Sequence, residues 1–90
     1  VYFMQAKIHV KNKRWIEAIE RYQKAKEYDD FLKDDALYEM GIIYQDILKE
    51  PDKALSCFEE IILKHQDSFY TFEARKRFRI LRGDFNDDKL

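Results

Sequence analysis

The amino-acid sequence repeats at a spacing of about 35 residues, and this internal repeat limits the fold more than any other feature. Shifting the chain along itself brings small residues onto small ones and one large aromatic residue onto another, except that Ala25 falls on Ile61. The matched pairs are Ala6 with Gly41, Ala18 with Ala54, Tyr22 with Phe58, Ala25 with Ile61, and Gly41 with Ala74. Such a period is typical of proteins that stack one short supersecondary unit. The sequence therefore predicts an array of similar units within one small domain.

Each unit is predicted to be helical, because apolar residues follow a helical period along the chain. Two glycines and one proline leave few residues for tight turns, which argues against a fold rich in β-strands. The expected helices span approximately residues 2–10, 15–28, 35–48, 51–64 and 69–81.

The ends of these expected helices carry residues suited to them. Pro51 suits the first turn of the fourth helix, and Gly83 suits the position that follows the fifth. Asp34 or a neighbour is expected to cap the third helix, and Asp67 or Ser68 the fifth.

Gly41 lies in the interior of the expected third helix, where glycine costs about 1 kcal/mol relative to alanine. Close packing of two antiparallel helices can outweigh this cost if the glycine lies at their contact. We therefore predict that Gly41 and Ala54 lie against each other's helices, with large aromatic side chains filling the space beside them. The predicted repeat core is Ala6, Ala18, Tyr22, Gly41, Tyr44, Ala54, Phe58 and Ala74.

These residues resemble the signature of the tetratricopeptide repeat, W-x2-L-G-x2-Y followed by A-x3-F. One copy reads Leu37-x2-Met40-Gly41-x2-Tyr44 and then Ala54-x3-Phe58; another reads Tyr2-x2-Gln5-Ala6-x2-His9 and then Ala18-x3-Tyr22-x2-Ala25. The resemblance implies an all-α, TPR-like α-α superhelix of about five antiparallel helices over residues 1–83. Repeat 1 is expected at about 1–33, repeat 2 at about 34–67 and a closing helix at about 68–82, with a flexible tail over 84–90.

A weaker resemblance concerns the segment EEIILKHQDSFYTFEARKRF, which is similar to a segment common in bacterial cell-envelope members of the family, including outer-membrane assembly lipoproteins. Gln66 stands where that segment has proline, and many cytoplasmic members share it. The compartment therefore stays open between the cell envelope (periplasm) and the cytoplasm. No apolar run approaches the roughly 20 residues of a membrane-spanning helix.

The family resemblance implies a protein-interaction scaffold that binds a peptide or a partner helix on a concave face lined by the first helix of each pair. The residues expected on that face are Phe3, Lys7, Lys11, Tyr38, Ile42, Gln45, Arg75 and Arg79. Basic side chains beside an aromatic strip favour an acidic peptide or a C-terminal carboxylate. The alternative is that these residues pack against a neighbouring repeat, or lie on a solvated helix near its C-terminal dipole.

Two further hypotheses remain. The chain opens in a helix-like segment without an initiator Met, so it is expected to be a fragment of a longer repeat protein, and Tyr2 and Phe3 at its exposed end favour self-assembly into a homo-oligomer. Nucleic-acid binding through the basic last helix is less favoured, because the formal net charge is −1 and the pI about 6.1.

Catalytic and metal-binding chemistry is not expected. One cysteine, Cys57, excludes an internal disulfide and a cysteine-based metal cluster. His9 and His65 have no acidic residue or cysteine at metal-ligand spacing, and no catalytic triad or phosphate-binding loop is present. We therefore expect a non-enzymatic protein without a cofactor, in which His9 occupies the tyrosine position of the repeat core.

Overall fold

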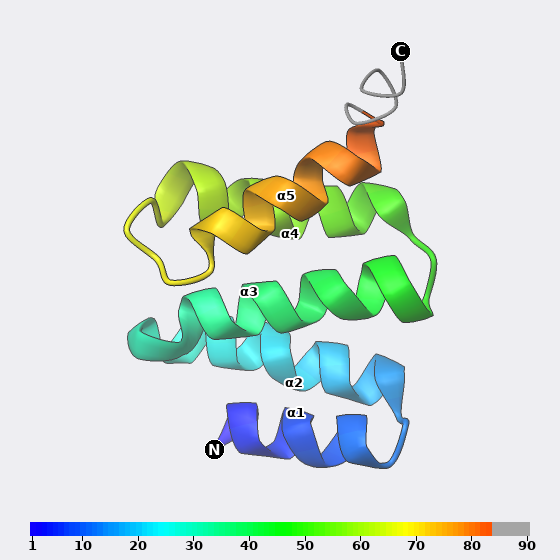
Figure 1. Ribbon diagram of the computed structural model, residues 1–90. Helices are drawn as coiled ribbons and strands as arrows, with labels where there is room; N and C mark the ends of the chain where they lie inside the picture. The colour runs from blue at the N-terminus through cyan, green and yellow to red at the C-terminus, as the bar shows by residue number, and fades with distance from the viewer. Residues whose placement is uncertain (84–90) are drawn as a thin grey trace.

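The computed structural model describes residues 1–83, which form a serial stack of antiparallel α-helices (Figure 1). The helices are α1 (Tyr2–Lys11), α2 (Trp15–Tyr28), α3 (Lys33–Ile42), α4 (Pro51–Lys64) and α5 (Thr71–Arg82). A 3-10 turn, η1 (Asp30–Leu32), precedes α3, and a π-helical segment, η2 (Ile43–Ile47), continues it. The part of the chain that is described contains no strand, so the all-α prediction is confirmed. The expected flexible tail, 84–90, lies outside the described residues.

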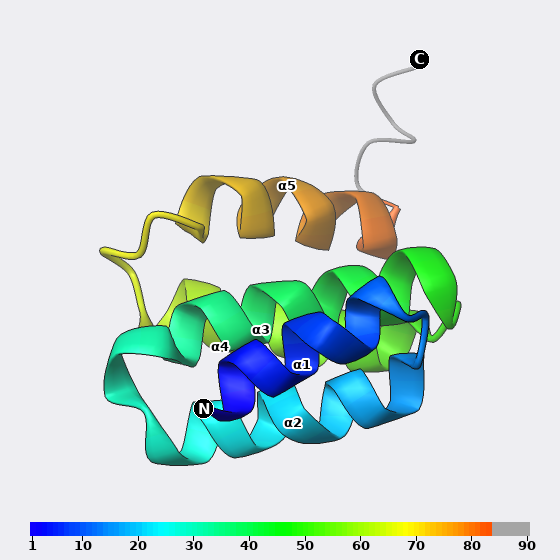
Figure 2. The same cartoon turned by 90° about the horizontal axis from the view of Figure 1, so that it is seen from below.

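Each helix packs mainly on its neighbours in sequence. α1 pairs with α2 and α3 pairs with α4, while α5 packs on α4. Figure 2 shows the stack from below, with α2 and α5 at opposite edges of the view. The stack is elongated, measuring 46 × 28 × 17 Å along its principal axes. Nearest-neighbour packing of this kind is the arrangement of helical-repeat proteins.

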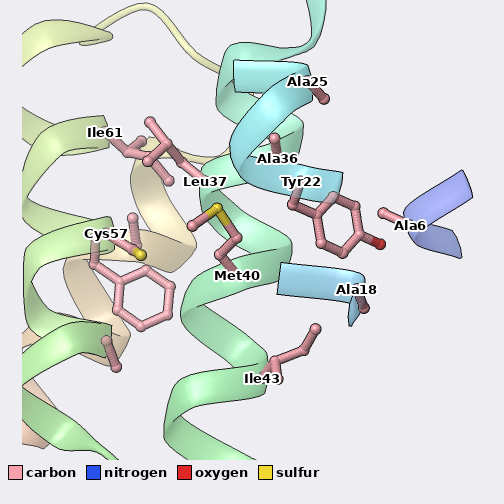
Figure 3. Close-up of a cluster of buried hydrophobic side chains, with 13 residues drawn as sticks. Ala6, Ala18, Tyr22, Ala25, Ala36, Leu37, Met40, Ile43, Cys57 and Ile61 are labelled. Atoms are coloured by element: carbon pink, nitrogen blue, oxygen red, sulfur yellow. The ribbon is translucent and has the colours of Figure 1, made fainter. Parts of the chain in front are cut away.

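The core runs along the interior of the stack and combines alanines with a few large side chains (Figure 3). The predicted repeat-core residues are buried, except for Tyr44, which is partly buried. In Figure 3 the Tyr22 ring extends from α2 toward Ala6 of α1, so a large side chain meets a small one. This complementarity allows the two helices to pack closely.

Gly41 lies at the contact between α3 and α4. A Cβ atom added there would lie 2.6 Å from both Cε1 and Cζ of Phe58, well inside van der Waals distance. The atoms nearest to Gly41 thus belong to the Phe58 ring, one helical turn beyond Ala54. Gly41 is retained in a helix because any side chain would separate the two helices.

The π-helical segment η2 explains an irregularity of the sequence repeat. Matched residues are 35 positions apart before η2, as for Ala6 and Gly41, but 36 apart after it, as for Ala18 and Ala54. A π-helical turn holds one residue more than an α-helical turn, as the bond from the Leu48 N–H to the Ile43 carbonyl shows. The extra residue of the second copy is therefore accommodated inside the helix.

Lys13 and Lys49 end the first helix of each pair in the left-handed conformation. Their φ angles are 59° and 56°, and they too are 36 positions apart. The turn after α1 is closed by bonds from the Arg14 N–H to the His9 carbonyl and from the Lys13 N–H to the Val10 carbonyl. Both turns lead directly into the second helix, and Pro51 begins α4 as predicted.

The expected N-terminal caps differ from those observed. α3 begins after η1 with no side-chain cap, and Asp34 instead places Oδ1 2.9 Å from Nδ1 of His65, at the end of α4. α5 begins at Thr71 rather than near Phe69, because Ser68 Oγ accepts a bond from the Tyr70 N–H in a turn ahead of the helix. Gly83 ends α5 with φ 82°, as predicted.

The burial pattern of α5 supports a different equivalence from the one expected between Ala74 and Gly41. Ala74 is buried, and Phe78 and Leu81 pack against the core, as Ala36, Met40 and Ile43 do in α3, each 38 positions earlier. α5 therefore packs on α4 as α3 packs on α2. The connection between α4 and α5 holds the two additional residues, so Ala74 takes the place of Ala36.

Candidate protein-binding surfaces

Two of the predicted binding residues form a pair on α1. The Phe3 ring packs edge-on against Tyr22, with 5.4 Å between ring centroids, and Lys7 Nζ lies 5.5 Å from the Phe3 centroid. Phe3 is partly buried, whereas Lys7 and Lys11 are exposed. Because Tyr22 holds the ring, Phe3 presents a fixed apolar surface beside two mobile positive charges.

The corresponding residues of α3 are Tyr38 and Ile42, both partly buried. Tyr38 stacks on Tyr70 with 4.7 Å between centroids and packs edge-on against Phe58 at 6.1 Å. A hydrogen bond to Asp35, together with burial, raises the pKa of Tyr70 to about 12. Tyr38 is thus held between the core and the turn that precedes α5.

Gln45, at the far end of this face, already has a partner. Arg77 Nη1 of α5 donates to Gln45 Oε1 at 2.8 Å and lies 3.5 Å from Asp46 Oδ2. The sequence analysis missed this role of Arg77, and helical spacing alone does not reveal it, because it depends on how α5 lies across the end of α3. We refer to Phe3, Lys7, Lys11, Tyr38, Ile42 and Gln45 as the α1–α3 face.

Arg75 and Arg79 line a different surface from the α1–α3 face. They border a groove between α4 and α5, which we call the arginine groove; it is lined by Glu59, Ile62, Leu63, Arg75, Phe78, Arg79 and Arg82. Arg75 and Arg79 also border a second depression, on α5, with Phe72 and Lys76. They are separated from the α1–α3 face because residues of α5 are equivalent to those of α3 at a separation of 38. The positions of Tyr38 and Ile42 are therefore occupied in α5 by Lys76 and Ile80.

The titratable groups with shifted pKa values are structural. Burial raises the pKa of the Cys57 thiol to about 11, and burial also raises the pKa of Tyr22. A thiol with a raised pKa is a poor nucleophile at neutral pH. Within residues 1–83, no group of three or more His, Cys, Asp or Glu side chains is arranged to hold a metal ion.

Comparison with known proteins identifies the repeat in the middle of the stack. Residues 35–68 match the family model of the tetratricopeptide repeat. The matched segment covers most of α3, η2 and α4, and hence one helix pair with its turn. No match was found among curated proteins or among solved structures.

The helical stack and this match together define the class of the fold as all-α and TPR-like. Tetratricopeptide repeats generally mediate contacts between proteins. No finding supports the weaker resemblance to cell-envelope members. In the part of the chain that is described, every helix is too short or too polar to cross a lipid bilayer.

Proposed function

We propose that the chain is a non-catalytic scaffold that binds an acidic peptide or partner helix on the α1–α3 face. The observation that carries this proposal is that Tyr38 and Ile42 of α3 repeat the positions of Phe3 and Lys7 of α1. Each lies 35 residues after its equivalent. Equivalent positions on successive first helices form a continuous row in a repeat stack. The row offers partly exposed aromatic and aliphatic surface next to lysines.

The chemistry of this face fits a ligand with carboxylates and one apolar side chain. Lys7 and Lys11 are one helical turn apart and can each approach a carboxylate, while Phe3, Tyr38 and Ile42 offer apolar contact. Lysine provides charge without a fixed geometry. A peptide that ends in a free carboxylate, or a helix with acidic residues, therefore suits the face.

The experiment is a titration of the isotopically labelled chain with an acidic peptide that contains one aromatic residue and a free C-terminus, followed by amide NMR shifts. We expect the shifts to concentrate on Phe3, Lys7, Tyr38 and Ile42. The double variant Lys7→Glu with Lys11→Glu should weaken binding about tenfold or more, because two attractions become repulsions.

The matched control is Lys13→Glu with Arg14→Glu, which reverses two exposed charges in the turn between α1 and α2. This control should bind the peptide nearly as well as the unaltered chain. Shifts that map away from α1 and α3, or equal losses in both double variants, would show that the α1–α3 face is not the binding surface.

A second candidate function is self-association through the outer side of α1. The expected contacts, Tyr2 and Phe3, are partly buried, because their rings pack against Tyr28 and Tyr22. Three other residues are exposed instead: Val1 by 87%, Met4 by 63% and Ile8 by 57%. They form an apolar row along α1, and the equivalents of Val1 and Ile8 in α3 are Ala36 and Ile43, both buried.

A further inference from the structure

The packing of α4 shows what kind of surface accepts the second helix of a pair. Leu37 and Gly41 of α3 and Tyr44 of η2 lie along the side that faces α4, and the Phe58 ring of α4 lies against Gly41. Gln23 and Lys26 of α2 border the same surface. The surface is almost entirely apolar or small at its centre, which suits an apolar helix.

The arginine groove is the equivalent surface one repeat later. Arg75, Arg79 and Arg82 occupy the positions of Leu37, Gly41 and Tyr44, each 38 residues further along, and Phe78 occupies that of Met40. On α4, Glu59 and Ile62 replace Gln23 and Lys26. Among residues 1–83, no element covers this surface as α4 covers α3.

An apolar second helix would not fit this surface. It would place a large apolar side chain, equivalent to Phe58, against the Arg79 guanidinium and remove that charge from water. Burying an unpaired charge is strongly unfavourable, whereas a carboxylate that pairs with a guanidinium can form two parallel hydrogen bonds. A helix in this position therefore needs acidic residues opposite the arginines.

We propose that the arginine groove binds an acidic amphipathic helix of a partner protein, in the orientation that α4 adopts against α2 and α3. Ile62, Leu63 and Phe78 contact the apolar stripe of the partner helix, and Arg75 and Arg79 pair with carboxylates one turn apart. Leu63 is 62% exposed, and within residues 1–83 neither Arg75 nor Arg79 has an ion-pair partner. Arg82 stacks on Phe78, with its Cζ 5.2 Å from the ring centroid.

The groove favours a protein helix over the other occupants. Its apolar floor, formed by Ile62, Leu63 and Phe78, has no role in holding a phosphate backbone but suits the apolar stripe of a helix. A second copy of the groove would bring arginines against arginines. The proposal concerns a different surface from the α1–α3 face and does not depend on the proposed function.

The test uses a helical peptide of about 14 residues, the length of α4, with a leucine stripe flanked by glutamates one turn apart. A matched peptide carries glutamine in place of each glutamate. Binding to the full chain is measured by fluorescence anisotropy at low and at moderate salt. We expect the glutamate peptide to bind roughly tenfold or more tightly than the glutamine peptide, with the difference shrinking as salt rises.

Variants of the chain test whether the peptide binds in the arginine groove. Arg75→Glu with Arg79→Glu should reduce affinity for the glutamate peptide roughly 100-fold, and the milder Arg75→Gln with Arg79→Gln should reduce it less. Lys13→Glu with Arg14→Glu, in the turn between α1 and α2, should leave it unchanged. Thermal melts followed by circular dichroism verify that each variant is folded.

Three results would overturn the proposal. The first is equal affinity for the glutamate and glutamine peptides, including no binding of either. The second is loss of binding in the Lys7 and Lys11 variant rather than in the arginine variants. The third is displacement of the peptide by a short single-stranded oligonucleotide that binds more tightly, which would make the groove a nucleic-acid site.

Discussion

Gly41 shows how one residue sets the distance between two helices. The Phe58 ring occupies the volume that a side chain at this position would need, and Phe58 itself is fully buried. The ring cannot move away without disturbing the rest of the core, because protein interiors are close-packed. The stability of the second repeat therefore depends on the absence of a single methyl group.

We predict that Gly41→Ala destabilises the chain by about 1 kcal/mol, measured by urea unfolding. Alanine gains about 1 kcal/mol of helix propensity, and overpacking against Phe58 costs up to about 3 kcal/mol. Combining it with Phe58→Leu provides the control, since leucine vacates part of the ring volume. The double variant should lose less than the sum of the two single losses; strict additivity would mean that the contact does not limit packing.

The alternation of small and large residues was readable from the sequence, because the repeat presents it twice. The side-chain contacts between residues far apart in the sequence could not be read in this way. Arg77 with Gln45, and His65 with Asp34, join residues more than 30 positions apart, and their pairing depends on how the helices are placed. Local patterns predict which residues are buried, but they carry little information about which polar groups meet across a stack.

At the scale of elements, the turns within each helix pair are the most regular feature. Lys13 and Lys49 both adopt positive φ, a conformation that costs a residue with a side chain about 1 kcal/mol or more. Glycine is the usual residue at this position. Among residues 1–83, neither lysine side chain has a hydrogen-bond or ion-pair partner, so the backbone conformation dominates the effect of substitution there.

Lys49→Gly is therefore expected to stabilise the chain by about 0.5 kcal/mol. Glycine relieves the strain of the positive φ angle, but it also raises the entropy of the unfolded chain, which offsets part of the gain. Lys13→Gly should act in the same direction. Lys76→Gly, in the middle of α5, is the matched control and should destabilise by about 1 kcal/mol. Thermal or urea unfolding measures all three, and a loss of stability in Lys49→Gly would contradict the explanation.

Helix positions could largely be predicted from the sequence, because each helix has an apolar stripe and few breaking residues. The start of α5 could not. Thr71 Oγ1 donates to the His65 carbonyl, and the turn it closes delays the helix and rotates its face. This rotation separates Arg75 and Arg79 from the α1–α3 face, so the predicted site divides into two surfaces.

At the scale of the whole molecule, the two ends of the stack differ in chemistry. The outer side of α1 is apolar, with Val1, Met4 and Ile8 exposed. The outer side of α5 and α4 is the arginine groove. An end-on contact between them would bury guanidinium groups against aliphatic side chains, which is unfavourable.

If the apolar end mediates self-association, sedimentation velocity at increasing concentration should show a dimer. Met4→Lys with Ile8→Lys should keep the chain monomeric, because both side chains are already exposed and their change removes apolar area without disturbing the core. Lys13→Glu with Arg14→Glu serves again as a control and should not alter the sedimentation. A monomer at every concentration would exclude this candidate function.

The unlike ends also restrict the geometry of any assembly. Head-to-tail contacts that repeat without closure generate open fibres, whereas a patch that pairs only with its own copy closes after two subunits under a two-fold axis. If the apolar patch of α1 pairs with its own copy, we expect association to stop at an isologous pair, because the patch does not suit the arginine groove. For these residues, a dimer that closes on itself is therefore the expected assembly, and an open fibre is not.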